Sequence, residues 1–181
     1  REAGTLPPLA RVGMQCQLPA EFSKLSWYGR GPFESYADRK DAALVGSYSA
    51  TVAGQYFPYL MAQENGNKTD VRWAQLTNEA GQGLLISRVG DGLLNINARD
   101  YTDGALLAAK NQQQQEIQRD SITVLNIDFQ QMGLGGDDSW TPRTHAEYLL
   151  PANRPYTYSF RLRPIDARTD RKEVVSMVLP R

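Results

Sequence analysis

The stretch RVGMQCQL, from Arg11 to Leu18, decides the fold class because apolar and polar side chains alternate along it. A period of two is typical of a β-strand with one buried face. Similar runs recur at four places: LLNINA (93–98), SITVLNIDF (121–129), TYSFRLRP (157–164) and EVVSMVL (173–179). Their tyrosine, threonine and β-branched residues favour strands over helices. The sequence therefore predicts a chain built mainly of β-strands.

Turn signals separate these runs, and one segment has helical character. The chain holds 15 glycines and 10 prolines, and clusters such as GRGP at 29–32 favour tight turns. The helical segment is TDGALLAAKNQQQQE at 102–116, where Thr102 or Asp103 is a candidate N-cap. Glutamines 112–115 are predicted to form a solvated helix end. Many short strands and few helices predict an all-β fold, either an antiparallel sandwich or a barrel. The sandwich is favoured because the chain has more strands than a small barrel needs.

Length and charge limit the class of protein. The 181 residues carry 20 basic and 20 acidic side chains, which indicates one domain of ordinary size and argues against nucleic acid as a partner. The chain has no apolar run of about 18 residues, so we expect no contact with a membrane. A single cysteine excludes a disulfide within the chain. The first residues, 1–8, begin with arginine and indicate a linker, so we expect residues 9–181 to form a domain of a longer protein.

The polar residues offer weak candidates for metal binding or nucleophilic catalysis. Asp137 and Asp138, with Asp128 nearby in sequence, are oxygen ligands of the kind that calcium or magnesium prefers, but their spacing fits no EF-hand and turn aspartates are common. Cys16 and His145 cannot form a metal site by themselves. His145 is the only histidine, and no GxSxG motif accompanies it, so a surface or partner-contact position is favoured. No metal ligand and no catalytic residue is assigned.

Two glutamates lie in distinctive loops. Paired carboxylates cleave glycosides, but the sequence alone cannot pair any two of the 20 acidic residues. Glu34 in GPFESYADR and Glu64 in AQENGNKTDVRW are each predicted to bind a neighbouring arginine or backbone amide instead. Arg39 and Arg72 lie close in sequence for that role.

The three tryptophans differ in their surroundings. Trp27 and Trp73 fall within strand-like patterns, so core packing is expected for both. Trp140 follows two acids in the glycine loop GLGGDDSWTP, at 133–142. An aromatic ring beside hydrogen-bonding groups suits a sugar, because the ring covers the apolar face of a pyranose. The alternative is a ring folded back to plug the end of the sandwich.

Five blocks of this sequence together resemble a known family. They are LPPLARVGMQCQLP, LSWYGRGPFESYADRKDA, PYLMAQENGNKTDVRW, VLNIDFQQMGLGGDDSWTP and YTYSFRLRP. In this order they are similar to the C-terminal small-chain domain, domain 5, of the large bacterial β-galactosidases of glycoside hydrolase family 2. The resemblance runs from about Leu9 to Pro164. The segment 112–120 and the tail 166–181 follow no block of the family.

The resemblance implies an antiparallel β-supersandwich related to the galactose mutarotase-like fold. In this family the full enzyme hydrolyses terminal β-D-galactosides such as lactose with retention, using two glutamates of a separate TIM-barrel domain. The motifs of that barrel have no counterpart in this chain, so we expect the chain alone to be inactive. The magnesium and sodium sites of the family belong mainly to the barrel, and we expect no cofactor here. The resemblance implies a bacterial protein, leaves cytoplasm or periplasm open, and implies a homo-oligomeric parent enzyme.

One binding residue follows from the resemblance. It implies that Trp140 stacks on the galactoside at the mouth of the active site. Gly135 and Gly136 would then form the turn, while Asp137 and Asp138 would stiffen it through bonds to backbone amides. The competing hypothesis is a stand-alone galactoside-binding module without catalysis. Mutarotase-like chemistry is a weaker third possibility, because a fold does not imply a function.

Overall fold

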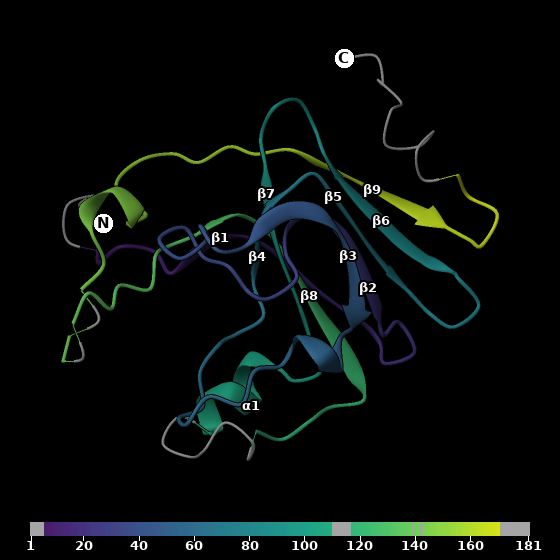
Figure 1. The fold of residues 1–181 in the computed structure, drawn as a ribbon, viewed down its shortest axis with the longest axis horizontal. Coiled ribbons are helices and arrows are strands. Elements are labelled where there is room, and N and C mark those ends of the chain that lie inside the picture. Colours follow the sequence, from purple (N-terminus) through teal and green to yellow (C-terminus); the bar gives the residue numbers. More distant parts are fainter. Residues whose placement is uncertain (1–5, 110–116, 139, 142, 171–181) are drawn as a thin grey trace.

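The structure, a computed structural model, describes residues 6–109, 117–138, 140–141 and 143–170 as an antiparallel β-sandwich (Figure 1). One sheet has four strands in the order β1-β8-β7-β4, and the other has five in the order β3-β2-β5-β6-β9. The predicted all-β fold and its two-sheet antiparallel sandwich are confirmed. The strands are β1 (Arg11–Pro19), β2 (Lys24–Gly31), β3 (Leu44–Thr51), β4 (Lys68–Val71), β5 (Trp73–Thr77), β6 (Gly83–Arg88), β7 (Leu94–Arg99), β8 (Ile122–Gln131) and β9 (Phe160–Ile165).

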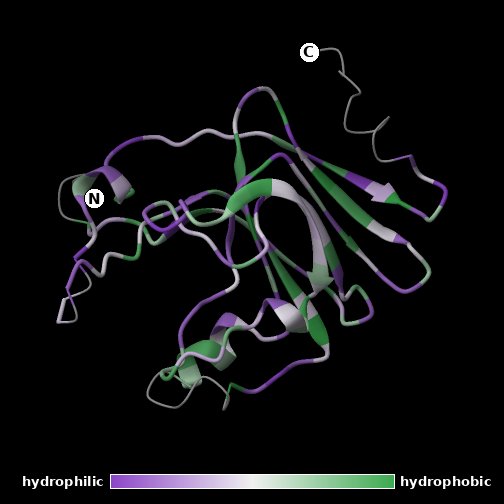
Figure 2. Ribbon diagram, viewed as in Figure 1, coloured by the Kyte–Doolittle hydropathy of each residue, from purple (hydrophilic) through white to green (hydrophobic). Residues whose placement is uncertain are grey.

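The core lies between the two sheets. Trp27 of β2 and Ile86 of β6 come from one sheet, and Ile96 of β7 and Ile127 of β8 come from the other. All four are at most 1% exposed. Figure 2 shows green, hydrophobic segments on strands of both sheets. Burying apolar surface on both sheets is the main force that holds the sandwich together.

The alternation in β1 agrees with the burial of its side chains, whereas the alternation in β9 does not hold throughout. Met14, Cys16 and Leu18 of β1 pack against the core while the residues between them are exposed. At the other end of the chain, Phe160 is partly buried but Leu162 is 41% exposed. The alternation in TYSFRLRP predicts that Leu162 shares the buried face with Phe160. This prediction was wrong because β9 is the edge strand of its sheet, where the sheet of four strands gives less cover.

Trp27 and Trp73 lie on opposite faces of the five-stranded sheet. Trp27 is 1% exposed and belongs to the main core, as predicted. Trp73 is half-buried and packs on a smaller cluster with Leu85 and Ile165 on the outer face. The expectation of core packing therefore holds for Trp73 only at this second cluster, because its neighbour Ala74 takes the position in the main core on β5.

One short helix, α1 (Asp103–Ala108), follows β7. The hydroxyl of Thr102 accepts a hydrogen bond from the backbone amide of Ala105 at 3.0 Å. Of the two predicted N-cap residues, Thr102 is therefore the one that caps the helix. Residues 110–116, which include the predicted glutamine-rich helix end, lie outside the described residues, as does the predicted strand at 173–179. Within the described part of the chain, no helix is long and apolar enough to span a membrane. The boundary proposed at residue 9 stays a prediction.

Candidate functional site

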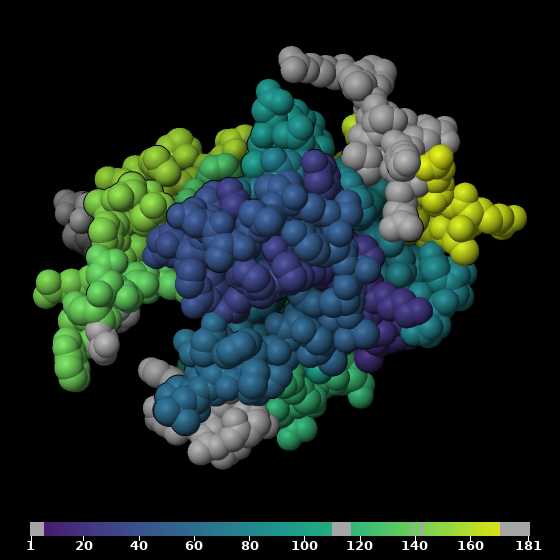
Figure 3. All heavy atoms as spheres, viewed as in Figure 1, coloured from purple at the N-terminus to yellow at the C-terminus, as the bar shows by residue number. Residues whose placement is uncertain are grey.

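The loop that holds Trp140 connects β8 to a single turn of 3-10 helix, η3 (Ala146–Tyr148). Its glycines turn the backbone: φ is 72° at Gly135 and 102° at Gly136, a region that side chains disfavour. In the space-filling view, the green segment around residues 133–148 projects from the body of the molecule beside the blue surface of residues 33–60 (Figure 3). The loop is thus a protrusion with a defined turn at its start.

Asp138 braces the backbone at the tip of this loop. Its carboxylate accepts the backbone amides of Trp140 at 2.8 Å and of Thr141 at 2.6 Å, and the Thr141 hydroxyl at 2.9 Å. These bonds, that of the Thr141 amide first, hold the pKa of Asp138 below its ordinary value. Such an Asx-type arrangement limits the motion of the backbone that presents the tryptophan.

Asp137 has a different partner from the one the sequence indicates. Its carboxylate pairs with Nε2 of His145 across the loop, and no bond from Asp137 to a backbone amide is seen in the described part of the chain. This contact is the main reason why the pKa of His145 is raised. Asp137 therefore links the two sides of the loop through side chains, and His145 lies on the surface as predicted.

The indole of Trp140 is 90% exposed. It does not plug the end of the sandwich, so that alternative is wrong. The ring therefore makes little contact with the described part of the domain and contributes little to its core.

The aspartates suggested as metal ligands are not brought together. Asp128 is 1% exposed on β8, and its Oδ2 lies 3.2 Å from Nε of Arg11, whereas Asp137 and Asp138 lie on the exposed loop. The described residues contain no group of three or more His, Cys, Asp or Glu side chains that could hold a metal ion. Burial raises the pKa of Asp128 to about 7, and the charge of Arg11 opposes this rise.

The base of the Trp140 loop is tied to neighbouring segments. The amide of Gly133 donates to the carbonyl of Tyr148 at 2.9 Å, and the hydroxyl of Thr144 donates to the carbonyl of Gly133 at 3.1 Å. The amide of Gly135 donates to Oδ2 of Asp38 at 2.8 Å. Sequence reasoning missed Asp38, since nothing in the GPFESYADR block distinguishes it from other surface acids.

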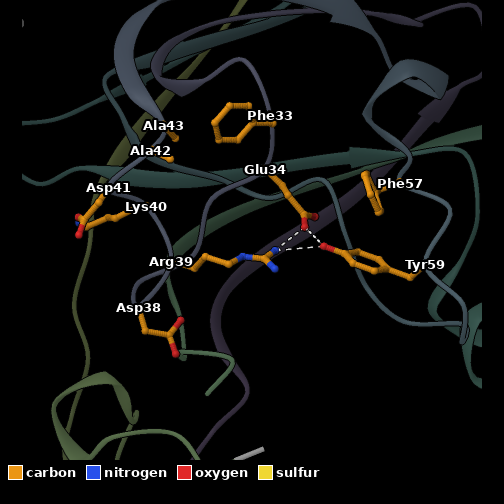
Figure 4. Close-up of a pocket in the computed structure, with 10 residues that line it drawn as sticks. All are labelled: Phe33, Glu34, Asp38, Arg39, Lys40, Asp41, Ala42, Ala43, Phe57 and Tyr59. Carbon is orange, nitrogen blue, oxygen red and sulfur yellow. Dashed lines mark hydrogen bonds and ion pairs between the residues drawn. The ribbon is translucent and has the colours of Figure 1, made fainter. Parts of the chain in front are cut away.

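Asp38 also lines a pocket of about 560 Å³ (Figure 4). Aromatic rings form part of its wall, and those of Phe57 and Tyr59 are 4.6 Å apart between centroids. The ten lining residues are Phe33, Glu34, Asp38, Arg39, Lys40, Asp41, Ala42, Ala43, Phe57 and Tyr59.

Glu34 is the centre of the polar contacts at this pocket. Its carboxylate accepts from Arg39 and from the hydroxyl of Tyr59, both drawn in Figure 4, from the hydroxyl of Tyr36 at 3.0 Å and from the amide of Gly66 at 2.8 Å. Four donors occupy both oxygens, so Glu34 is a structural hub and a poor candidate for an acid or base. The predicted pairing of Glu34 with an arginine or a backbone amide is confirmed.

Glu64 also pairs with an arginine, but with one far away in sequence. Its partner is Arg11 of β1, with Arg99 of β7 further off at 3.7 Å. Arg72, suggested for this role, instead donates to the carbonyl of Asp70 at 2.5 Å and lies over the ring of Tyr28. The suggestion of Arg72 was wrong because Arg11 and Arg99 reach Glu64 from the four-stranded sheet, which sequence spacing does not show.

The fold and the loop together define a class of protein: an antiparallel β-sandwich domain with an aromatic ring exposed on a braced loop. The family model described as the β-galactosidase small chain matches residues 2–162, and the chain belongs to this family. It is similar to a β-galactosidase of Priestia megaterium, at 45% identity over 161 residues that are 89% of this chain and 15% of the relative. It is 38% identical to the β-galactosidase BgaC of Bifidobacterium adolescentis and to a β-galactosidase of Pseudoalteromonas haloplanktis, over 88% and 87% of this chain and 15% and 14% of those proteins. The chain thus spans about 15% of the length of these relatives and corresponds to one domain of a larger polypeptide.

Proposed function

We propose that this chain contributes Trp140 to the substrate site of a β-galactosidase of glycoside hydrolase family 2. The observation behind the proposal is an indole that is 90% exposed on a loop braced by Asp138. A flat aromatic ring covers the C–H face of galactose, and nearby polar groups take the hydroxyls. The names of the relatives, all β-galactosidases, support galactosides such as lactose as the substrate class.

The chemical step is proposed to take place elsewhere in the same polypeptide. Glycoside cleavage with retention uses two carboxylates about 5 Å apart, one as nucleophile and one as acid and base. The resemblance assigns them to a TIM-barrel domain, together with the magnesium and sodium sites. In this proposal the chain alone is inactive, the barrel is its partner, and the parent enzyme is a homo-oligomer.

The second candidate is a stand-alone module that binds galactosides without cleaving them. The pocket lined by Phe33, Phe57 and Tyr59 favours it, because aromatic walls with polar groups between them suit a sugar. In that case the chain would bind sugar without the barrel.

A fluorescence titration of the chain with galactose and lactose separates the two candidates. The Trp140→Ala variant is the matched control, because Trp27 is buried and Trp73 half-buried and both add constant background. We expect a flat response from the folded chain, since the barrel supplies the rest of the site. Saturable binding would favour the module, whether seen as quenching that Trp140→Ala abolishes or as heat in a calorimetric titration run alongside. The calorimetric titration is needed because no tryptophan lines the pocket of Phe33, Phe57 and Tyr59. In the full polypeptide, we expect Trp140→Ala to raise the KM for a galactoside, and an unchanged KM would overturn the proposed role.

A further inference from the structure

A side-chain carboxylate from a distant segment contacts the start of the Trp140 loop. Asp38 lies in the connection between β2 and β3, and its Oδ2 accepts the amide of Gly135, 97 residues further along the chain. A hydrogen bond between a charged acceptor and a backbone amide is stronger than one between neutral groups. This bond is made at the start of the turn formed by Gly135 and Gly136.

The approach of the two segments is close enough to restrict the residue types. A Cβ atom at Gly133 would lie 2.5 Å from Oδ2 of Asp38 and 2.7 Å from Cβ of Tyr148. Gly133 therefore lets the loop pass directly over the carboxylate. The hydrogen bond from Gly135 to Asp38 is therefore possible only because residue 133 has no side chain.

Asp38 is itself held in a rigid segment. The backbones of Tyr36 and Arg39 on either side exchange two hydrogen bonds of 3.0 Å, and Tyr36 is 1% exposed. Arg39 is bound in turn to Glu34, the hub of the pocket. The position of Asp38 is therefore set by the body of the domain.

The other oxygen of Asp38, Oδ1, is buried and has no hydrogen-bond partner among the described residues. An unpaired buried carboxylate oxygen is unfavourable to the folded state. Folding stability alone therefore does not explain why residue 38 is an aspartate. The hydrogen bond from the Gly135 amide to Oδ2 does explain it.

We propose that Asp38 is a positioning residue for galactoside binding: by holding Gly135 it sets the base of the loop and so the direction in which the Trp140 ring faces the sugar. This inference rests on the proposed function of Trp140. Asp38 acts through the loop and does not itself contact substrate. Since the ring binds the sugar before and during the reaction alike, loss of its orientation affects KM more than kcat.

The test uses the full β-galactosidase polypeptide that contains this chain, with lactose as the substrate. Asp38→Ala is expected to raise KM roughly fivefold, with kcat changed by less than about twofold. Asp38→Asn keeps an acceptor oxygen and should retain a KM near that of the unmodified enzyme. Asp91→Ala is the matched control, because Asp91 is exposed in the connection between β6 and β7 and does not line the pocket. If Asp38→Ala fails to fold, Asp38→Ser replaces it, since its shorter side chain withdraws the acceptor from Gly135.

A double variant distinguishes positioning from a general effect on structure. When Trp140→Ala is already present, adding Asp38→Ala should change KM by less than about twofold, because the ring to be oriented is gone. A KM that rises with Trp140→Ala but not with Asp38→Ala overturns the inference and leaves the proposed function standing. The inference is also overturned if Asp38→Ala raises KM by the same factor with and without Trp140→Ala. A KM unchanged by Trp140→Ala overturns the proposed function and the inference with it.

Discussion

The carboxylate of Asp138 accepts the backbone amide of Trp140 at 2.8 Å, so the most exposed tryptophan of the chain is braced by an acid two residues before it. The same carboxylate also accepts the amide of Thr141, and these bonds hold the pKa of Asp138 below its ordinary value. The acid therefore remains ionised and bonded well below neutral pH. An exposed ring on a stiff backbone loses little conformational entropy when it binds a ligand.

Replacing Asp138 by alanine should loosen the loop without harming the fold. In the full polypeptide we expect the KM for lactose to rise roughly threefold, because the ring must be ordered on binding. The thermal midpoint should stay close to that of the unmodified protein, since Asp138 is exposed. Steady-state kinetics and a melting curve measure both. A KM equal to that of the unmodified enzyme would contradict the bracing role.

Gly136→Ala tests the backbone conformation of the turn alone. A Cβ at Gly136 would meet no atom within 4 Å, but φ is 102°, where alanine is strained. We expect a higher KM and a cost of about 1 kcal/mol in the free energy of unfolding, unless the loop changes conformation to relieve it. Gly92→Ala is the control, because its Cβ also meets open space and its φ is not in the disfavoured region. Equal effects of the two substitutions would argue against a required turn at Gly136.

Trp27→Ala should destabilise the domain by about 3–5 kcal/mol, the usual result of truncating a large buried aromatic side chain. The ring is 1% exposed, and its indole N–H donates to the carbonyl of Arg30 at 2.9 Å. Trp140→Ala is the matched control, and we expect it to change the free energy of unfolding very little. Urea unfolding of both variants measures the difference. Comparable losses would mean that the Trp140 ring is packed in the folded chain.

Asp128→Asn tests the electrostatics of the four-stranded sheet. Burial raises the pKa of Asp128 to about 7 in the folded chain, and the charge of Glu64 adds to this rise. The charge of Arg11, whose Nε lies 3.2 Å from Oδ2, opposes it. Between pH 4 and this value the folded chain binds more protons than the unfolded chain does. The contribution of Asp128 to stability is therefore present at low pH and declines as pH rises toward 7, by at most about 1.4 kcal/mol per pH unit.

The free energies of unfolding of Asp128→Asn and the unmodified chain should be compared from pH 4 to pH 8. We expect the asparagine variant to gain stability relative to the unmodified chain as pH rises. If the asparagine variant instead loses stability relative to the unmodified chain as pH rises, the ion pair with Arg11 outweighs burial.

Local patterns predicted much of the fold. The alternation in 11–18 identified β1 and its inward side chains, and Thr102 was one of two residues predicted to cap the helix. These features depend on neighbours in sequence, so the pattern contains them. The exposure of Leu162 was missed because it depends on the number of strands in the facing sheet, which no local pattern specifies.

In the candidate site too, local features were predicted from the sequence and contacts between distant segments were not. The glycines, acids and tryptophan of 133–142 were singled out from the sequence, and the positive φ at Gly135 and Gly136 follows from local sterics. The partner of Glu64 was predicted wrongly, and Asp38 was not predicted at all, because both contacts join segments far apart in the chain.

The sequence by itself determined the fold class, the position of the aromatic loop and the resemblance to the β-galactosidase small chain, since all three depend on the order of side chains along the backbone. Only the tertiary structure decided that Trp140 is held in solvent and that Asp38 supports the start of its loop. The physical reason is that exposure and long-range hydrogen bonds depend on how two sheets and their loops pack together. Residues 97 positions apart meet at 2.8 Å only after that packing is complete.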